Sequence, residues 1–274
     1  MPRELTPLEQ VERSLHKKYR DTLWAPFIAS LKEYDLLQPG DRVAVCISGG
    51  KDSMLLAKLF QLLHRRSDFP FEVRYLVMDP GYNPENRAKI EENARLLDLP
   101  VTLFETDIFQ VTGGLEKNPC YLCARMRRGH LYKQAQSLGC NKIALGHHFN
   151  DVIETTVMAM FYGGQLQGML PKLHSRNYPG MELIRPLYRV HEEDIISWAR
   201  YNHLEFIRCA CRFTENADRD RDSKRQEVKL LLRSLKQDNP NVEMSIFNAL
   251  HHLHRDTFPG WKDASGDHSF LEGY

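Results

Sequence analysis

The stretch Ser48-Gly49-Gly50-Lys51-Asp52-Ser53 decides how the rest of the chain is interpreted. It follows the apolar, β-branched run of residues 42–47, which predicts a buried strand, and it precedes residues 54–63, which are rich in helix formers. Two glycines at such a corner let the backbone approach a ligand, and the helix start directs free N–H groups at an anion. The serines add hydroxyl donors, Lys51 adds a cation, and Asp52 can hold Mg²⁺ against phosphate oxygens. The stretch therefore predicts a phosphate-binding loop.

The type of loop decides which reaction is expected. A Walker loop needs a glycine and a Ser or Thr at the positions that hold Val45 and Asp52, so that interpretation fails. A turn without a ligand needs at most one glycine. The residues instead resemble the PP-loop, Ser-Gly-Gly-x-Asp-Ser, of the ATP pyrophosphatase superfamily. That resemblance implies an adenine nucleotide alpha hydrolase-like domain in which residues 48–53 bind ATP and Mg²⁺, Lys51 and Asp52 are catalytic, and a substrate becomes adenylated.

Composition and charge restrict the class of protein. The chain has 274 residues, of which 42% are hydrophobic, and its net charge is +1. We find no apolar run of bilayer-spanning length and no signal-peptide pattern, so the cytoplasm is expected and no membrane is predicted as a partner. Six cysteines in a cytosolic chain favour metal binding or catalysis over disulfides. Cys46, inside the first strand, and Cys140, just before the fourth, are expected to be small core residues.

Strands and helices alternate along most of the chain. This order predicts a doubly wound parallel sheet of the α/β class, preceded and followed by helical extensions. Ligands of such sheets bind beyond the carboxyl ends of the strands, where Ser48, Asp79 and Gly146 fall. The predicted domains are a helical segment at 1–35 broken at Pro26, an α/β domain at 36–214 and a helical tail at 215–274. Strands are predicted at 42–47, 71–78, 101–104 and 142–145, with helices at 54–63, at 84–97, at 121–138 and after Asn150.

A second half of the nucleotide site is expected after the fourth strand, in Gly146-His147-His148-Phe149-Asn150-Asp151. The glycine allows close backbone approach, and Asp151 is placed to bind the nucleotide or its metal, although an Asp near a helix start is more often a cap. Both histidines are expected to be structural rather than catalytic. The predicted nucleotide contacts outside the loop are Met78, Asp79, Gly146, His147 and Asp151.

Four cysteines form two short-spaced pairs, Cys120-x-x-Cys123 and Cys209-x-Cys211. Pro119 places the first pair at a helix start, where thiolates are favoured. The spacing leaves open a structural zinc, an iron–sulfur cluster, and a redox or persulfide pair without metal. Zinc would want four closed ligands, and a Cys-x-Cys spacing is tight for that geometry.

A longer resemblance favours the cluster. The stretches Cys-Tyr-Leu-Cys-Ala-Arg-Met-Arg-Arg-Gly-His-Leu-Tyr at 120–132 and Lys-Ile-Ala-Leu-Gly-His-His-Phe-Asn-Asp-Val-Ile-Glu-Thr at 142–155 carry it, together with 160–164 and 169–172. In this order they resemble the tRNA 2-thiocytidine synthetases, PP-loop enzymes that place sulfur at cytidine 32 of tRNA. The likeness covers residues 36–214 and continues weakly into the tail. It implies a 4Fe–4S cluster on Cys120, Cys123 and Cys209, which follows an expected strand end at Phe206-Ile207, with Cys211 as the alternative third ligand.

The implied chemistry is coherent with the residues. Adenylation turns the C2 oxygen of a cytidine into a leaving group, and Mg²⁺ with Lys51 can stabilise the charge on pyrophosphate. An iron without a protein ligand can carry the sulfur that attacks C2, and the base must be flipped or single-stranded to reach both centres. The implied partners are tRNA and a cysteine desulfurase or another sulfur donor, and the sequence leaves a homodimer open. Predicted RNA contacts are Arg125, Arg127, Arg128, Lys172, Arg185 and Arg189.

Two other functions remain open at this point. A PP-loop enzyme that adenylates a different, non-tRNA substrate would turn over ATP without RNA. A non-catalytic sensor of ATP and a cluster would bind ATP without releasing pyrophosphate.

Overall fold

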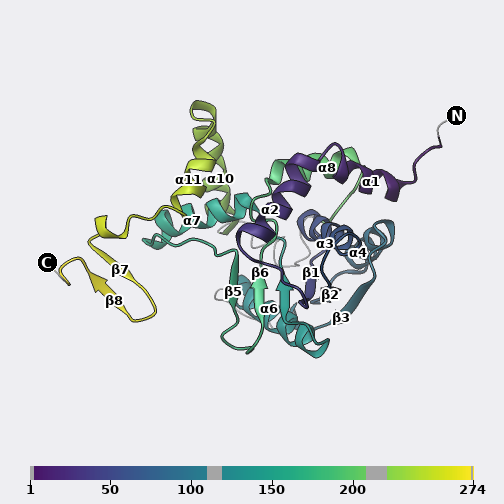
Figure 1. Ribbon diagram of the computed structural model, residues 1–274, viewed down its shortest axis with the longest axis horizontal. Coiled ribbons are helices and arrows are strands. Elements are labelled where there is room, and N and C mark those ends of the chain that lie inside the picture. The colour runs from purple at the N-terminus through teal and green to yellow at the C-terminus, as the bar shows by residue number, and fades with distance from the viewer. Residues whose placement is uncertain (1–2, 110–118, 208–220, 273) are drawn as a thin grey trace. The chain divides into compact units, whose positions relative to one another are not determined.

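The computed structural model describes residues 3–109, 119–207, 221–272 and 274 (Figure 1). The chain forms two compact units. One comprises Met1–Val152 with Met169–Lys224, and the other comprises Ile153–Gly168 with Arg225–Tyr274.

The larger unit contains a six-stranded sheet in the order β3-β2-β1-β4-β6-β5. The pairs β1–β2, β2–β3, β1–β4 and β4–β6 are parallel, so the predicted doubly wound sheet is confirmed. The edge strand β5 is antiparallel to β6, and neither of these two strands was predicted. The strands are β1 Arg42–Ile47, β2 Glu72–Asp79, β3 Val101–Glu105, β4 Lys142–Ala144, β5 Lys172–His174 and β6 Glu182–Ile184.

Helices cover both faces of this sheet because residues on each strand alternate between two cores. Val43, Val45 and Ile47 of β1 face a core shared with α1, α2, α3, α4 and α8. Ala44 and Cys46 face a second core built with α6. The helices of this unit are α1 Pro7–His16, the π-helix η1 Arg20–Trp24, α2 Ala25–Glu33, α3 Lys51–His64, α4 Pro84–Leu96, α6 Pro119–Ser137 and α8 Glu192–Tyr201.

Two expectations about local structure turn out differently. Pro26 does not separate two helices by a loop; it lies in the first turn of α2, directly after the π-helix. Residues 204–207 form no strand, so the strand end expected at Phe206-Ile207 is wrong. Phe206 instead stacks on Trp198, with ring centroids 6.3 Å apart.

The smaller unit is mostly helical but ends differently from the predicted tail. It contains residues 153–163 of α7 (Phe149–Gly163) and residues 225–238 of α10 (Arg221–Asp238), followed by α11 Val242–Ala249 and the 3₁₀ turn η2 Arg255–Thr257. The buried carboxylate of Glu154 in α7 forms ion pairs with Arg225 at 3.2 Å and with Lys229 at 3.7 Å. The chain then forms an unpredicted hairpin of β7 Gly260–Lys262 and β8 Asp267–Ser269. In the part of the chain that the structure describes, no helix is long and apolar enough to cross a membrane.

Candidate active site

The loop between β1 and α3 has a backbone that only glycine allows. Gly49 adopts φ +86°, and a Cβ there would lie 2.5 Å from Ile90 Cγ1 and 2.7 Å from Ile207 Cδ1. Gly50 is the N-cap of α3, and no side chain of the described residues caps the helix there. The first N–H groups of α3 are therefore not claimed by a capping side chain, which fits a phosphate at this position.

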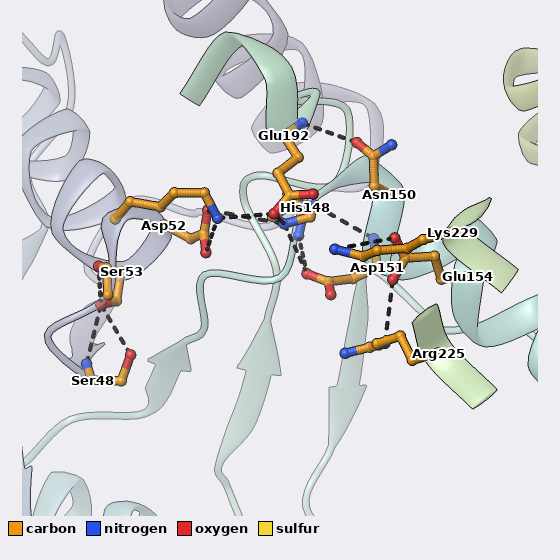
Figure 2. A network of polar contacts seen from close by, with 12 residues as sticks. Ser48, Asp52, Ser53, His148, Asn150, Asp151, Glu154, Glu192, Arg225 and Lys229 are labelled. Carbon is orange, nitrogen blue, oxygen red and sulfur yellow. Dashed lines mark hydrogen bonds and ion pairs between the residues drawn. The ribbon is translucent and has the colours of Figure 1, made fainter. Parts of the chain in front are cut away.

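The two serines hold the loop in this shape. Ser53 Oγ accepts a hydrogen bond from Ser48 N at 3.1 Å (Figure 2). It also donates one to Gly50 O at 2.9 Å. The loop after β4 approaches the same turn closely, because a Cβ on Gly146 would lie 3.1 Å from Ser53 N. Gly146 therefore packs on the backbone at the start of α3, and its close approach to a nucleotide stays a prediction.

Lys51 carries the positive charge of the site and is held by two carboxylates. Its Nζ lies 3.1 Å from Asp52 Oδ1 and 3.0 Å from Glu192 Oε1. Burial lowers the pKa of Lys51, but the charges of Asp52 and Glu192 outweigh it and raise the pKa above its ordinary value. Lys51 is therefore fully protonated at neutral pH and presents a fixed cation beside the phosphate loop.

Sequence reasoning missed Glu192. It opens α8, 141 residues after Lys51, and its N–H donates to Asn150 Oδ1 at 2.9 Å. The signal that could have found it is the acidic helix start Glu192-Glu193-Asp194 following a sheet strand. Because β6 is only three residues long, that strand was not recognised.

His148 lies at the centre of three carboxylates. Its Nε2 is 3.9 Å from Asp52 Oδ1, 3.5 Å from Asp151 Oδ2 and 4.0 Å from Glu192 Oε1 (Figure 2). Asp151 also caps the start of α7, because its Oδ2 accepts from His148 N at 3.0 Å and its N–H is directed at His148 Nδ1 at 3.4 Å. The carboxylates come from the segments after β1, β4 and β6, so the sheet brings them together at its carboxyl edge.

Asp52 is the residue best placed to bind a divalent cation. Its Oδ1 is buried, and among the described residues it accepts no hydrogen bond of normal geometry, although Lys51 is near. A hard carboxylate oxygen that lies beside a phosphate loop and keeps a lone pair free of hydrogen bonds of normal geometry fits Mg²⁺. No group of three or more metal-ligating side chains is assembled in the part of the chain described, so phosphate oxygens and water would complete the coordination.

The nucleotide contacts predicted at the end of β2 have structural partners. Met78 is buried in a small core with Ile108 and Phe109. Asp79 is 4% exposed, and its Oδ1 accepts from Gly81 N at 2.8 Å and Tyr82 N at 2.7 Å. This carboxylate shapes the turn after β2.

The predicted RNA contacts differ in their surroundings. Arg125 and Arg128 are exposed on α6, and Arg127 is partly buried. Lys172 Nζ donates to Asp35 O at 2.7 Å, and Arg189 forms an ion pair with Glu33. Arg185 is 7% exposed, so it lies inside the protein rather than on its surface.

The cysteines are only partly described. Cys46 and Cys140 are buried free thiols, as predicted, and burial raises the pKa of Cys46 to about 12. The backbone of Cys120 and Cys123 lies in the first turn of α6, but their side chains fall outside the described part. Cys209 and Cys211 lie entirely outside the described residues.

Comparisons with known proteins agree with this geometry. The PP-loop domain family matches residues 9–229. A tRNA-cytidine(32) 2-sulfurtransferase of Citrifermentans bemidjiense is 37% identical, with 82% of this chain and 88% of that protein covered. The protein of the same name from Bordetella pertussis is 34% identical over 97% of this chain and 86% of that one. The solved U34-tRNA thiolase NcsA of Methanococcus maripaludis, with its 4Fe-4S cluster, has a TM-score of 0.65 at 21% identity, covering 84% of this chain and 79% of that chain. At that identity the likeness to the thiolase concerns the fold.

Proposed function

Because the chain belongs to the PP-loop domain family, and within it to the tRNA-cytidine(32) 2-sulfurtransferases, we propose that it replaces the C2 oxygen of a tRNA cytidine with sulfur at the expense of ATP. The observation that carries this proposal is the loop at residues 48–53, whose uncapped helix start and fixed cation form a phosphate site. The reaction is placed in the cytoplasm, and the base modified is cytidine 32.

The residues of the loop have separate tasks in the adenylation step. The N–H groups at the start of α3 and Lys51 bind the β- and γ-phosphates, and Asp52 holds Mg²⁺. ATP supplies the adenylyl group that converts the C2 oxygen of the cytidine into a leaving group. Lys51 stays protonated because Asp52 and Glu192 raise its pKa, so its charge is available as negative charge builds on the departing pyrophosphate.

Sulfur delivery is assigned to cysteines on α6 and in the segment around residue 209. Cys120 and Cys123 are three residues apart in the sequence, near the start of α6. Three thiolates suit a 4Fe–4S cluster that leaves one iron open, with Cys209 as the third ligand and Cys211 as its alternative. A cluster held by these cysteines would supply a binding site for sulfide. The sulfur comes from a cysteine desulfurase or another donor.

RNA binding is assigned to the same helix. Arg125, Arg127 and Arg128 follow the cluster cysteines within about two turns, so phosphates held there would lie beside the acceptor base. The cytidine must be unstacked to reach the site, as in a single-stranded loop. Lys172 and Arg189 would first have to exchange their carboxylate partners. A homodimer remains part of the proposal and is tested by analytical ultracentrifugation.

Pyrophosphate release with and without tRNA tests the adenylation step. The anaerobically purified chain is expected to release pyrophosphate from ATP only when unmodified tRNA is present, and Asp52→Asn should lower this rate by orders of magnitude. RNA-independent release would instead favour an enzyme with another substrate. ATP binding without any release would favour a sensor.

A further inference from the structure

Arg185 is a buried arginine that forms no ion pair with an acidic residue in the part of the chain that the structure describes. It is 7% exposed, its Nη1 donates to Leu170 O, and its Nε is buried without an acceptor. Among the described residues it forms no ion pair, although Asp151 is near enough to raise its pKa. Burial and the charge of Arg128 together lower the pKa of Arg185 to about 10. A buried guanidinium without a counter-ion is costly, and this cost calls for an explanation.

A second orphaned atom lies in the same neighbourhood. His147 Nδ1 is buried and bonded to nothing in the described part of the chain. Burial lowers the pKa of His147 to about 4, and the positive charge of Arg185 contributes to the shift. His147 is therefore neutral at physiological pH, and it adds hydrogen-bonding capacity without adding charge.

Both side chains lie near α6. Ile143 and Leu145 on one segment, and Leu183 on the next, belong to or pack against the core that includes Tyr132 of α6. Arg185 directly follows β6, two residues after Leu183, and the groups that act on its charge include Arg128 and Tyr132 of α6. Arg128 also acts on His147, so both side chains lie near this helix. The backbones remain joined at this point, since Leu145 N donates to Ile184 O at 3.0 Å.

Arg128 of α6 completes the group. Its charge acts on both His147 and Arg185, and it makes no ion pair with any described residue. The phosphate loop opens α3 on the opposite side of the sheet, whose core contains Val45 and Ile47. The carboxyl edge of the sheet thus has two different features. One is the loop for the nucleotide at the start of α3, and the other is a pair of arginines, Arg128 and Arg185, that form no ion pair with a described residue and lie at or near α6.

We propose that Arg185 and Arg128, with His147 beside them, form a subsite for one phosphodiester of the RNA next to the acceptor cytidine. A planar guanidinium can bind a phosphate through two parallel hydrogen bonds, and its Nε is one of the donors used. The bound phosphate supplies the missing counter-charge for Arg185 and the missing acceptor for its Nε. This inference rests on the proposed function for the identity of the RNA.

Two sources could supply a phosphate group here, the RNA backbone and the α-phosphate of ATP. The position on the α6 side favours RNA, because the nucleotide loop lies at the start of α3. Binding of each ligand, measured separately on the same variants, distinguishes the two sources.

The test uses the anaerobically purified full-length holoenzyme and an unmodified tRNA transcript containing cytidine 32. Arg185→Gln is expected to weaken RNA binding by roughly 10- to 100-fold and to reduce the slope of log K against log salt by about 0.7, the loss of one phosphate contact. Affinity for a non-hydrolysable ATP analogue should not change. Arg185→Lys keeps the charge but lacks the planar fork, so it should show an intermediate loss.

Arg176→Gln is the matched control. Arg176 is exposed in the turn that joins β5 to β6, at the end of β6 away from Arg185, so its loss removes the same charge from the same unit. It should leave RNA affinity within about twofold of wild type, since rim charges contribute little. If Arg185→Gln fails to fold, Arg128→Gln, which changes an exposed side chain, must show the reduced salt slope.

Three results would overturn the inference. One is a folded Arg185→Gln, or Arg128→Gln, variant with wild-type RNA affinity and salt slope. Another is a loss of ATP affinity without a loss of RNA affinity, which would assign the subsite to the nucleotide. The third is an equal loss in Arg176→Gln, which would indicate a general charge effect. If the wild-type enzyme fails to thiolate tRNA, the proposed function itself is wrong. If the wild-type enzyme thiolates tRNA but the Arg185→Gln variant keeps wild-type RNA affinity, only the proposed subsite is wrong.

Discussion

Glu192→Gln is the perturbation that most sharply tests how the site holds its cation. The substitution keeps the shape of the side chain and removes the charge that lies 3.0 Å from Lys51 Nζ. The two side chains are 26% and 23% exposed, so the pair is neither at the surface nor fully buried. A charge-assisted hydrogen bond in such surroundings contributes about 1.5–3 kcal/mol, which corresponds to roughly 10- to 150-fold in rate.

The lower part of that range is expected, because Asp52 still contacts Lys51 after the change. We expect kcat for tRNA-dependent pyrophosphate release to fall about 10- to 30-fold, while the KM for ATP changes less than about threefold. Glu192 repels phosphate as well as positioning Lys51, so its loss has opposing effects on ground-state binding.

The pH profile gives a readout that a purely structural role would not change. Glu192 and Asp52 raise the pKa of Lys51, and activity requires Lys51 to be protonated. Removing one carboxylate lowers that pKa, so the alkaline limb of the rate profile should move to lower pH. Glu193→Gln removes the same charge from the exposed neighbouring position and should leave both kcat and the limb unchanged. A wild-type kcat and an unmoved alkaline limb in Glu192→Gln would refute the assignment.

Three further predictions concern the loop, the cysteines and the hairpin. Gly49→Ala should lower the free energy of unfolding by about 2–4 kcal/mol in urea titrations, because it combines a left-handed backbone with a clash against Ile90. Gly40→Ala, at φ +84° with no atom within 4 Å, should cost only about 1 kcal/mol, and equal losses would contradict the clash. The anaerobically purified chain should carry close to four irons. Iron should be lost in Cys120→Ala, Cys123→Ala and Cys209→Ala and retained in Cys211→Ala, whereas Cys46→Ala and Cys140→Ala should lose stability alone. Stoichiometric zinc, or an iron content that depends equally on all four paired cysteines, would contradict an open iron. Hydrogen bonds to Glu272 and Asp263 raise the pKa of His268, so these contacts stabilise the β7–β8 hairpin while His268 is protonated. The hairpin amides should therefore be most protected from exchange below about pH 6.5, and they should lose this protection as the pH rises through the raised pKa. Protection that is flat with pH, or equally pH-dependent in His268→Gln, would contradict this.

Much of the sheet could be predicted because its central strands are buried on both faces. The continuous apolar run at 42–47 is β1, and the predicted strand at 101–104 is one residue shorter than β3. The edge strands β5 and β6 have three residues each, which is too short for a periodic signal. The tail hairpin was missed for the same reason.

The candidate site was predictable only where its residues are local in sequence. Residues 48–53 lie together in one turn, and the backbone conformation of this turn follows from its two glycines and the start of α3. Glu192 lies near Lys51 because β6, the strand that precedes it, pairs with β4 in the sheet. No local sequence pattern predicts that pairing. The burial of Arg185 is likewise a tertiary property, which is why sequence alone groups it with surface arginines.

The central claim is that this chain thiolates a tRNA cytidine, and nucleoside mass spectrometry tests it most directly. Total tRNA would be digested from a strain lacking the gene and from the same strain carrying the wild-type or the Asp52→Asn chain. We predict that 2-thiocytidine is absent from the deletion strain, is restored by the wild-type chain and stays absent with Asp52→Asn. Normal 2-thiocytidine in the deletion strain, or full restoration by Asp52→Asn, would contradict it.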